Sequence, residues 1–157
     1  MTTVNIIPYT AAHRADFARL NRAWIAKYFK VEPEDEAVLS DPETKIIAKG
    51  GHILMAELGG RIVGTVALYK HADGTFELAK MAVEENLRGQ GIGKKMGEAV
   101  LALARELGAE QVYIISNTRL ENSIALYRKL GFIDSPVDRH SRFERGDITL
   151  DYFVKAA

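Results

Sequence analysis

The chain has 157 residues, a length typical of one domain, and its 21 Lys plus Arg balance 21 Asp plus Glu. A formal net charge of zero argues against a nucleic-acid-binding protein, and no apolar run approaches the ~20 residues that span a bilayer. The sequence contains no cysteine, which excludes disulfides, thiolate metal sites and a cysteine nucleophile. We therefore expect a single cytoplasmic domain over residues 1–157, with no nucleic-acid partner, no membrane partner and no bound metal.

The beginning of the chain predicts a strand and a helix, followed by short irregular helices. Residues 4–7, which contain three β-branched side chains, are followed by Pro8, and this predicts a short strand. Thr10 can cap the helix that follows, in which apolar side chains recur at helical spacing. Residues 31–51 contain two prolines and a glycine pair, which indicates short helices and loops over one face of the protein.

Two apolar, β-branched runs and a third segment then predict an antiparallel group of strands. Residues 52–58 and 62–69 are joined by a Gly-Gly pair, which is a strong signal for a two-residue hairpin. An Asp-Gly turn leads into the third strand, at residues 76–83.

The second half of the chain alternates helices and strands. An amphipathic helix at 91–107, a strand at 112–116 and a helix at 121–130 follow one another. Two further strands are predicted, one beginning at Phe132 and one at 148–154. A helix between two strands favours a parallel pair. The whole pattern predicts an α/β (α+β) fold: a mixed, mostly antiparallel sheet of about six to seven strands with helices on both faces.

The sharpest local motif is a glycine-rich loop, RGQGIGKK at residues 88–95, between a predicted strand and a predicted helix. Glycine allows tight turns and close approach, and the N–H groups at a helix start bind anions such as a pyrophosphate. Neither the Walker loop nor the dinucleotide fingerprint matches, because Arg88 and Lys95 occupy positions that the Walker motif requires to be Gly and Ser or Thr. A glycine-rich turn that caps a helix without a ligand is the alternative.

A second motif follows the strand at 112–116. Asn117 ends that strand, Asn122 lies in the first turn of the next helix, and Tyr127 lies on the same helix. The two helical residues do not share a face, although both could meet an elongated ligand that passes the helix start. The alternative is that Asn122 is a simple cap and Tyr127 a core residue.

Together, the two motifs resemble the GNAT superfamily of acyl-CoA-dependent N-acyltransferases. The matching stretches are FELAKMAVEENLRGQGIGKKM at residues 76–96 and NTRLENSIALYRKLGF at 117–132. The first fits the family's pyrophosphate loop, Arg-x-x-Gly-x-Gly, and the second its Asn…Ala…Tyr…Leu-Gly-Phe segment. The resemblance implies a small stand-alone protein of bacterial type with a GNAT-like sheet, in which one parallel strand pair is splayed.

The resemblance also implies acetyl-CoA as a co-substrate and a set of residues that bind it. These residues comprise the strand that pairs with pantetheine, the pyrophosphate loop and the second motif: Met81, Ala82, Val83, Arg88, Gly89, Gln90, Gly91, Ile92, Gly93, Lys94, Asn117, Asn122 and Tyr127. Tyr127 matches the family's general acid, which protonates the leaving thiolate. A backbone N–H near Met81 is expected to stabilise the oxyanion.

Glu77 is the expected general base, acting directly or through a water molecule, because family members often carry a carboxylate at the matching place. The alternative is a strand-end charge that faces solvent or pairs with Lys80. His52, at the start of another strand, is a weaker candidate for the base.

The resemblance implies an acceptor site between the helical segment after the first strand and the C-terminal strands, where Trp24, Tyr28 and Arg142 are candidate substrate-binding residues. The same two segments contain Phe29, Arg139, His140 and Arg145, and their arginine-rich loop could clamp an acceptor carboxylate. The alternative is that the aromatic residues are core and the arginines solvated. The expected function is direct acetyl transfer, in a ternary complex, to a primary amine of a small molecule. Acetylation of a protein or peptide amine, and a non-catalytic acyl-CoA sensor, remain as alternatives, and a homodimer remains open.

Overall fold

The computed structural model describes residues 3–142 and 145–154. Its centre is a seven-stranded sheet with the strand order β1-β2-β3-β4-β5-β7-β6. The strands are β1 (Val4–Pro8), β2 (His52–Leu58), β3 (Arg61–Lys70), β4 (Phe76–Val83), β5 (Gln111–Ser116), β6 (Ile133–Asp134) and β7 (Ile148–Phe153). The α-helices are α1 (Arg14–Tyr28), α2 (Pro33–Ser40), α3 (Pro42–Lys45), α4 (Ile92–Glu106) and α5 (Glu121–Leu130).

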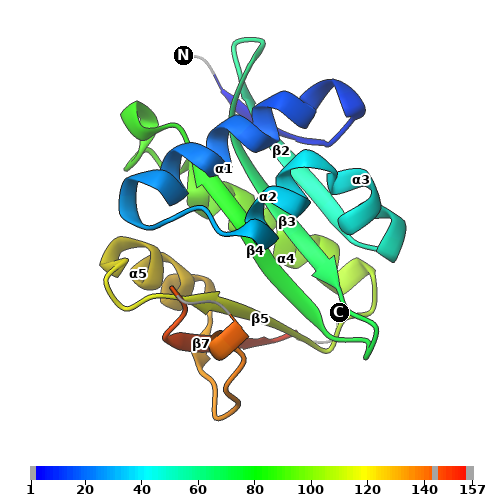
Figure 1. Cartoon of the computed structure of the whole chain (residues 1–157), viewed down its shortest axis with the longest axis vertical. Coiled ribbons are helices and arrows are strands. Elements are labelled where there is room, and N and C mark those ends of the chain that lie inside the picture. The colour runs from blue at the N-terminus through cyan, green and yellow to red at the C-terminus, as the bar shows by residue number, and fades with distance from the viewer. Residues whose placement is uncertain (1–2, 143–144, 155–157) are drawn as a thin grey trace.

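The topology confirms the mixed sheet that the sequence predicts. Every neighbouring pair of strands is antiparallel except β4 and β5, which are joined through α4 and run parallel. Figure 1 shows α1, α2 and α3 on the near face of the sheet and α4 behind it. The segment 31–51 forms short helices on one face, as its prolines indicate.

The two faces of the sheet carry separate cores. The stripe of apolar residues on α4 packs on one face, and Phe17 and Leu20 of α1 pack on the other. Neighbouring residues of one strand therefore serve different cores, as Val66 and Ala67 of β3 do. Because both faces of the central strands are covered, these strands read as nearly continuous apolar runs in the sequence.

Two elements differ from the sequence prediction. Thr10 caps a short 3-10 helix (Ala11–His13), and α1 itself begins only at Arg14. The strand predicted from Phe132 is reduced to the two residues of β6, because Phe132 is buried in the core on the α4 face and Pro136 soon follows. Proline cannot donate the backbone hydrogen bond that a longer strand would need.

Within the described residues, none of the helices combines the length and the apolar character that a membrane span requires.

Candidate active site

The parallel strands β4 and β5 diverge along their length. They pair at Phe76–Val112 and Glu77–Tyr113, and the described residues form no further pair between them. Beyond that point β4 stays paired with β3 and β5 with β7, so the two strands separate, as Figure 1 shows. Beyond Glu77, no strand of the described residues pairs with the edge of β4 that faces the opening, so an extended ligand can bind there as an added strand does.

A β-bulge lies on β4 beside this opening. Two residues of β4, Lys80 and Met81, lie opposite the single residue Val66 of β3. Lys80 has a φ of 53°, which among the described residues is the one positive value outside glycine. A bulge bends the strand and redirects its backbone groups, so a peptide N–H of this segment can point away from the sheet.

A short 3-10 helix (Glu85–Leu87) follows β4, and the glycine-rich loop leads from it into the first turn of α4. Gly89 and Gly91 have φ values of 81° and 83°, and a Cβ atom added to either would meet no atom within 4 Å. The space above the loop is therefore open on the side that a side chain would fill. The first N–H groups of α4 have no acceptor within the helix, and they share its positive dipole end. This arrangement suits a pyrophosphate.

Two residues of the loop motif also have structural roles. The side chain of Ile92 is buried in the core, so only its backbone can face a ligand. Gly93 lies in the first turn of α4, where an added Cβ would lie 3.1 Å from Leu126 of α5. Gly97, one turn later, faces Leu130 in the same way at 2.5 Å. These glycines let α4 and α5 pack closely, a role that the sequence motif does not reveal.

Tyr127 lies on α5, packed edge-on to Phe132 with ring centres 6.1 Å apart. Burial raises the pKa of the Tyr127 phenol to about 12, although a hydrogen bond with Ser123 opposes the shift. The phenol is therefore neutral at physiological pH and carries a proton to donate. Asn122 is exposed in the first turn of the same helix.

Asn117 forms two hydrogen bonds to the protein backbone. Its amide nitrogen donates to the carbonyl oxygen of Arg145 at 2.7 Å, and its side-chain oxygen accepts from the N–H of Arg119 at 2.8 Å. It therefore shapes the turn after β5 and holds the segment before β7. The cofactor contact predicted for Asn117 would have to be made in addition to these bonds or in place of them.

Glu77 is buried at the paired end of β4, with 3% of its side chain exposed. Its Oε1 accepts a hydrogen bond from the Tyr113 hydroxyl at 3.2 Å and lies 2.8 Å from His71 Nε2. Glu77 is therefore not a solvent-facing charge. His52 begins β2, which β3 separates from β4, so it lies away from the diverging strands.

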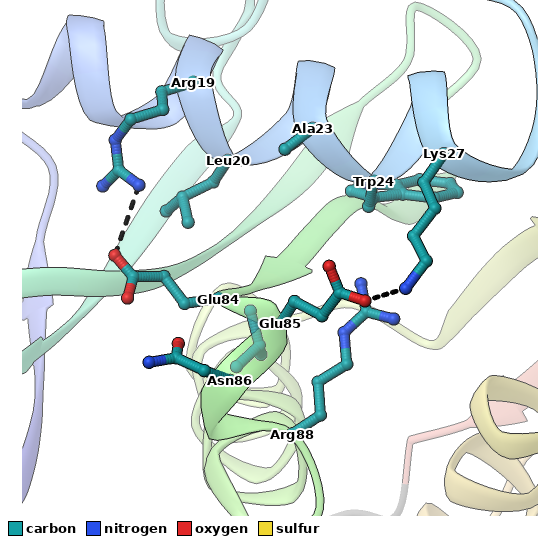
Figure 2. A pocket seen from close by; sticks show the side chains of 10 residues that line it. Arg19, Leu20, Ala23, Trp24, Lys27, Glu84, Glu85, Asn86 and Arg88 are labelled. Carbon is teal, nitrogen blue, oxygen red and sulfur yellow. Dashed lines mark hydrogen bonds and ion pairs between the residues drawn. The ribbon is translucent and has the colours of Figure 1, made fainter.

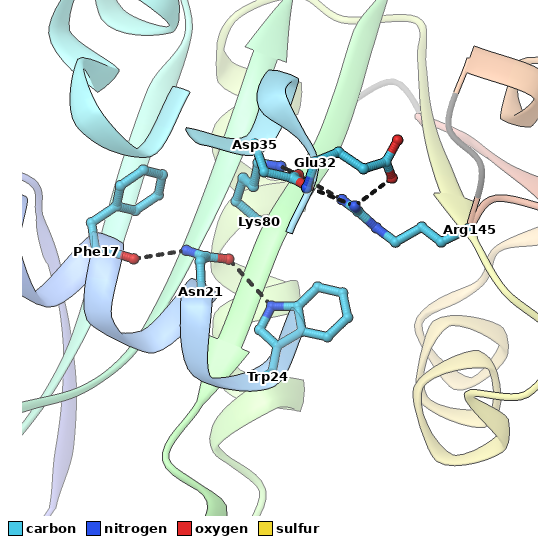
Figure 3. A network of polar contacts seen from close by, with 7 residues as sticks. All are labelled: Phe17, Asn21, Trp24, Glu32, Asp35, Lys80 and Arg145. Carbon is cyan, nitrogen blue, oxygen red and sulfur yellow. Dashed lines mark hydrogen bonds and ion pairs between the residues drawn. The ribbon is translucent and has the colours of Figure 1, made fainter. Parts of the chain in front are cut away.

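A buried ionic network lies on the face of the sheet that α1 and α2 cover (Figure 3). The Asp35 carboxylate of α2 binds Lys80 Nζ at 2.6 Å and the Arg145 guanidinium at 2.7 Å, and Arg145 also reaches Glu32 at 2.9 Å. Burial alone would raise the pKa of Asp35, but Arg145 and Lys80 outweigh it and hold the pKa well below its usual range. Burial in turn lowers the pKa of Lys80.

A pocket of about 350 Å³ lies between α1 and the segment that follows β4. Figure 2 shows Trp24 of α1 above this pocket and Glu85 and Arg88 below it. The Trp24 indole N–H donates to Asn21, which fixes the ring. Tyr28 accepts a hydrogen bond from Arg88 at 3.0 Å, and so α1 contacts the glycine-rich loop directly.

The structure describes the side chains of two of the three predicted acceptor residues. Trp24 lines the pocket and Tyr28 lies beside the loop, whereas the side chain of Arg142 lies outside the described part of the structure. The sequence did not indicate Asp35 or His71. It indicated Arg145 as part of a loop that could clamp an acceptor carboxylate, whereas the structure pairs Arg145 with Asp35 and Glu32. The described residues contain no group of three or more His, Cys, Asp or Glu side chains that could hold a metal ion.

Comparison with known proteins identifies the family. A model of the acetyltransferase (GNAT) family matches residues 17–132. The chain is 30% identical over 114 residues to the uncharacterised N-acetyltransferase YvbK of Bacillus subtilis, which covers 71% of this chain and 73% of YvbK. It is 33% identical over 89 residues to mouse N-acetyltransferase 8. This alignment covers 54% of this chain but only 39% of the mouse protein.

Solved structures agree on the fold. An acetyltransferase of the GNAT family from Staphylococcus aureus superposes with a TM-score of 0.86 at 20% identity, over 98% of this chain and 100% of that chain. The acetyltransferase of Bacillus subtilis in complex with CoA gives 0.71 at 18% identity, over 99% and 100%. The family match, the similarity to YvbK and the diverging strands together show that the chain belongs to the GNAT family of acetyl-CoA-dependent N-acetyltransferases.

Proposed function

We propose that the protein transfers an acetyl group from acetyl-CoA directly to a primary amine of a small molecule, with both substrates bound together. The observation that carries the choice of a small acceptor is the pocket beside Trp24, because its volume of about 350 Å³ is in the range of small-molecule sites. Direct transfer is supported by the absence of cysteine from the sequence, which leaves no thiol for an acyl-enzyme.

The proposed site for acetyl-CoA combines the loop with the free edge of β4. The open space above Gly89 and Gly91 fits a pyrophosphate held by backbone N–H groups. The pantetheine arm would follow the edge of β4 from Val83 to Met81, and Asn122 would hydrogen-bond the arm. The Bacillus subtilis relative was solved with CoA, and yncA of Salmonella typhimurium with its cofactor acetyl-CoA, which supports this choice of donor.

In the proposed reaction, three groups of this chain assist the attack of the amine on the thioester. The N–H near Met81, in the bulge, donates to the oxyanion that forms as the amine adds. Glu77 takes the proton that the amine nitrogen loses, through a water molecule, because it is buried three residues before the bulge on β4. Tyr127 donates its proton to the departing thiolate.

The test is CoA release from acetyl-CoA over a panel of acceptors. Since the protein has no cysteine, a thiol reagent reports the released CoA without background from the enzyme. The panel contains primary amines, amino acids, peptides with a free N-terminus and peptides with a free lysine. Amino acids are included because rat N-acetylaspartate synthetase is 36% identical over 84 residues, 53% of this chain and 28% of that protein.

We expect release with small amines and intersecting initial-velocity lines, as a ternary complex requires. Parallel lines would contradict direct transfer. Release with peptides alone would make the protein a peptide acetyltransferase, and binding of acetyl-CoA without turnover on any acceptor would make it a sensor.

A further inference from the structure

The Glu77 carboxylate is held by two rings at the closed end of the diverging strands. His71 Nε2 and the Tyr113 hydroxyl both approach its Oε1, at 2.8 and 3.2 Å. The side chain of Glu77 is 3% exposed, and a buried carboxylate depends on such donors. A buried base therefore has a titratable neighbour in direct contact.

His71 is held firmly in place. It follows β3, and its N–H donates to the carbonyl oxygen of Thr75 at 2.9 Å across the turn. Its ring stacks on Tyr113 with centres 5.9 Å apart and planes at 17°, and meets Tyr69 edge-on at 6.0 Å. Two aromatic neighbours thus restrain the imidazole, and its Nε2 faces Glu77.

The other side of His71 opens to solvent. The side chain is 29% exposed and lines a second pocket, of about 330 Å³, between α2 and the end of β3. The charged groups that line this pocket with His71 come from α2, α3, the segment before β2 and β3: Glu34, Lys45, Lys49 and Lys70. Asp73 lies in the same turn, and Arg139 covers Tyr113 at 4.5 Å. His71 can therefore exchange protons with water while Glu77 stays buried.

We infer that His71 is a positioning residue that sets the basicity of Glu77 during acetyl transfer. The inference rests on the proposed role of Glu77 as the base. With a neutral ring, the Nε2–H donates to Oε1, and the carboxylate can take the proton that the amine loses. With a charged ring, the pair is an ion pair that favours the ionised carboxylate, so Glu77 is a weaker base.

The proton balance is simple. The proton moves from the amine nitrogen, through water, to Glu77 and then to solvent, while His71 keeps its own Nε2 proton throughout. Histidine is the side chain that ordinarily changes charge between pH 5 and 8. The pair therefore makes turnover depend on the charge of the His71 ring.

The experiment compares the kcat of four proteins from pH 5.5 to 8.5 at saturating substrates: the parent, His71→Gln, His71→Phe and the control His13→Gln. Glutamine keeps a neutral donor at every pH. We expect His71→Gln to match the parent at pH 8.5 and to exceed it by about three- to tenfold at pH 5.5. His71→Phe removes the donor, so kcat falls at all pH values while the Kd of acetyl-CoA is unchanged. The ring of His13 instead accepts a hydrogen bond from the N–H of Thr10 before α1, so the control leaves the profile unaltered.

Glu77→Gln separates this inference from the proposed function. If that variant is as fast as the parent at neutral pH, Glu77 is not the base and the proposed function is wrong on this point. If it is slow while the ratio of His71→Gln to parent stays constant with pH, Glu77 remains the base and the role of His71 is overturned. A ¹³C titration of the Glu77 carboxyl in the parent needs no variant. If the chemical shift of the Glu77 carboxyl does not change when the His71 ring changes charge, the inference is also overturned.

Discussion

At the scale of single residues, Tyr127 is distinguished by a hydroxyl that burial keeps protonated. Because burial raises its pKa to about 12, the phenol remains a donor over the whole physiological range. A thiolate leaving group is a good acceptor for such a proton, since a thiol ordinarily has a pKa near 8.5.

We expect Tyr127→Phe to lower kcat by about 10²–10⁴ with little change in the Kd of acetyl-CoA, because only the proton donor is lost. Steady-state kinetics and a binding titration measure the two quantities. Tyr152→Phe is the matched control, because Tyr152 packs on Phe132 as Tyr127 does, with ring centres 5.4 Å apart. Equal kcat values in the two variants would return Tyr127 to the role of a core residue.

At the scale of elements, α4 carries a left-handed glycine at each end. Gly91 precedes the helix with a φ of 83°, and Gly108 follows it with a φ of 79°. An added Cβ would meet nothing within 4 Å at either position. An alanine would therefore be strained to the same extent at either position. The two positions differ in location, because only Gly91 lies in the glycine-rich loop.

We expect Gly91→Ala and Gly108→Ala to lower the Tm by similar amounts, since a left-handed alanine costs about 1–2 kcal/mol. Only Gly91→Ala places a methyl group where the pyrophosphate would lie. Thermal melts with and without millimolar acetyl-CoA should therefore show the stabilising shift in the parent and in Gly108→Ala, and a much smaller shift in Gly91→Ala. An equal shift in both variants would remove the loop from the binding site.

At the scale of the molecule, Asp35 joins parts of the chain that are far apart in sequence. It links α2 to the bulge of β4 and to Arg145, which is 110 residues away. Removing one partner of a buried ionic group leaves the other charges uncompensated, and this costs more than the pair itself contributes.

We expect Asp35→Asn to lower the free energy of unfolding by about 3–5 kcal/mol, measured by urea denaturation at pH 7. Because the pKa of Asp35 is held below its usual range, its contribution is complete above the unfolded-state pKa and is lost as the pH falls. The difference between parent and variant should therefore shrink in acid. Glu36→Gln, which breaks an exposed pair with Arg22, should leave the free energy of unfolding nearly unchanged at pH 7 and in acid.

Local features of the protein could be predicted from the sequence, whereas contacts between distant segments could not. Element order, the parallel crossover and the glycine loop were predictable, because apolar periodicity and a contiguous motif record them locally. The contacts of Glu77 with Tyr113, and of Asp35 with Arg145, depend on how distant segments meet. No local pattern records such contacts. The Asp-Gly turn between His71 and Thr75 was the available signal, since it places His71 beside the start of β4.

The divergence of β4 and β5 has a mechanical consequence for the whole protein. Strands β1 to β4 form one part of the sheet, and strands β5, β7 and β6 form the other. In the described residues, two residue pairs between β4 and β5 join these parts. Such a seam opens at a lower free energy than the sheet on either side. A ligand that binds between β4 and β5 would contact both strands and raise the free energy needed to separate them. Amide hydrogen exchange should therefore slow most on β4 and β5 when acetyl-CoA binds, whereas β2, which pairs with both β1 and β3, should hardly change.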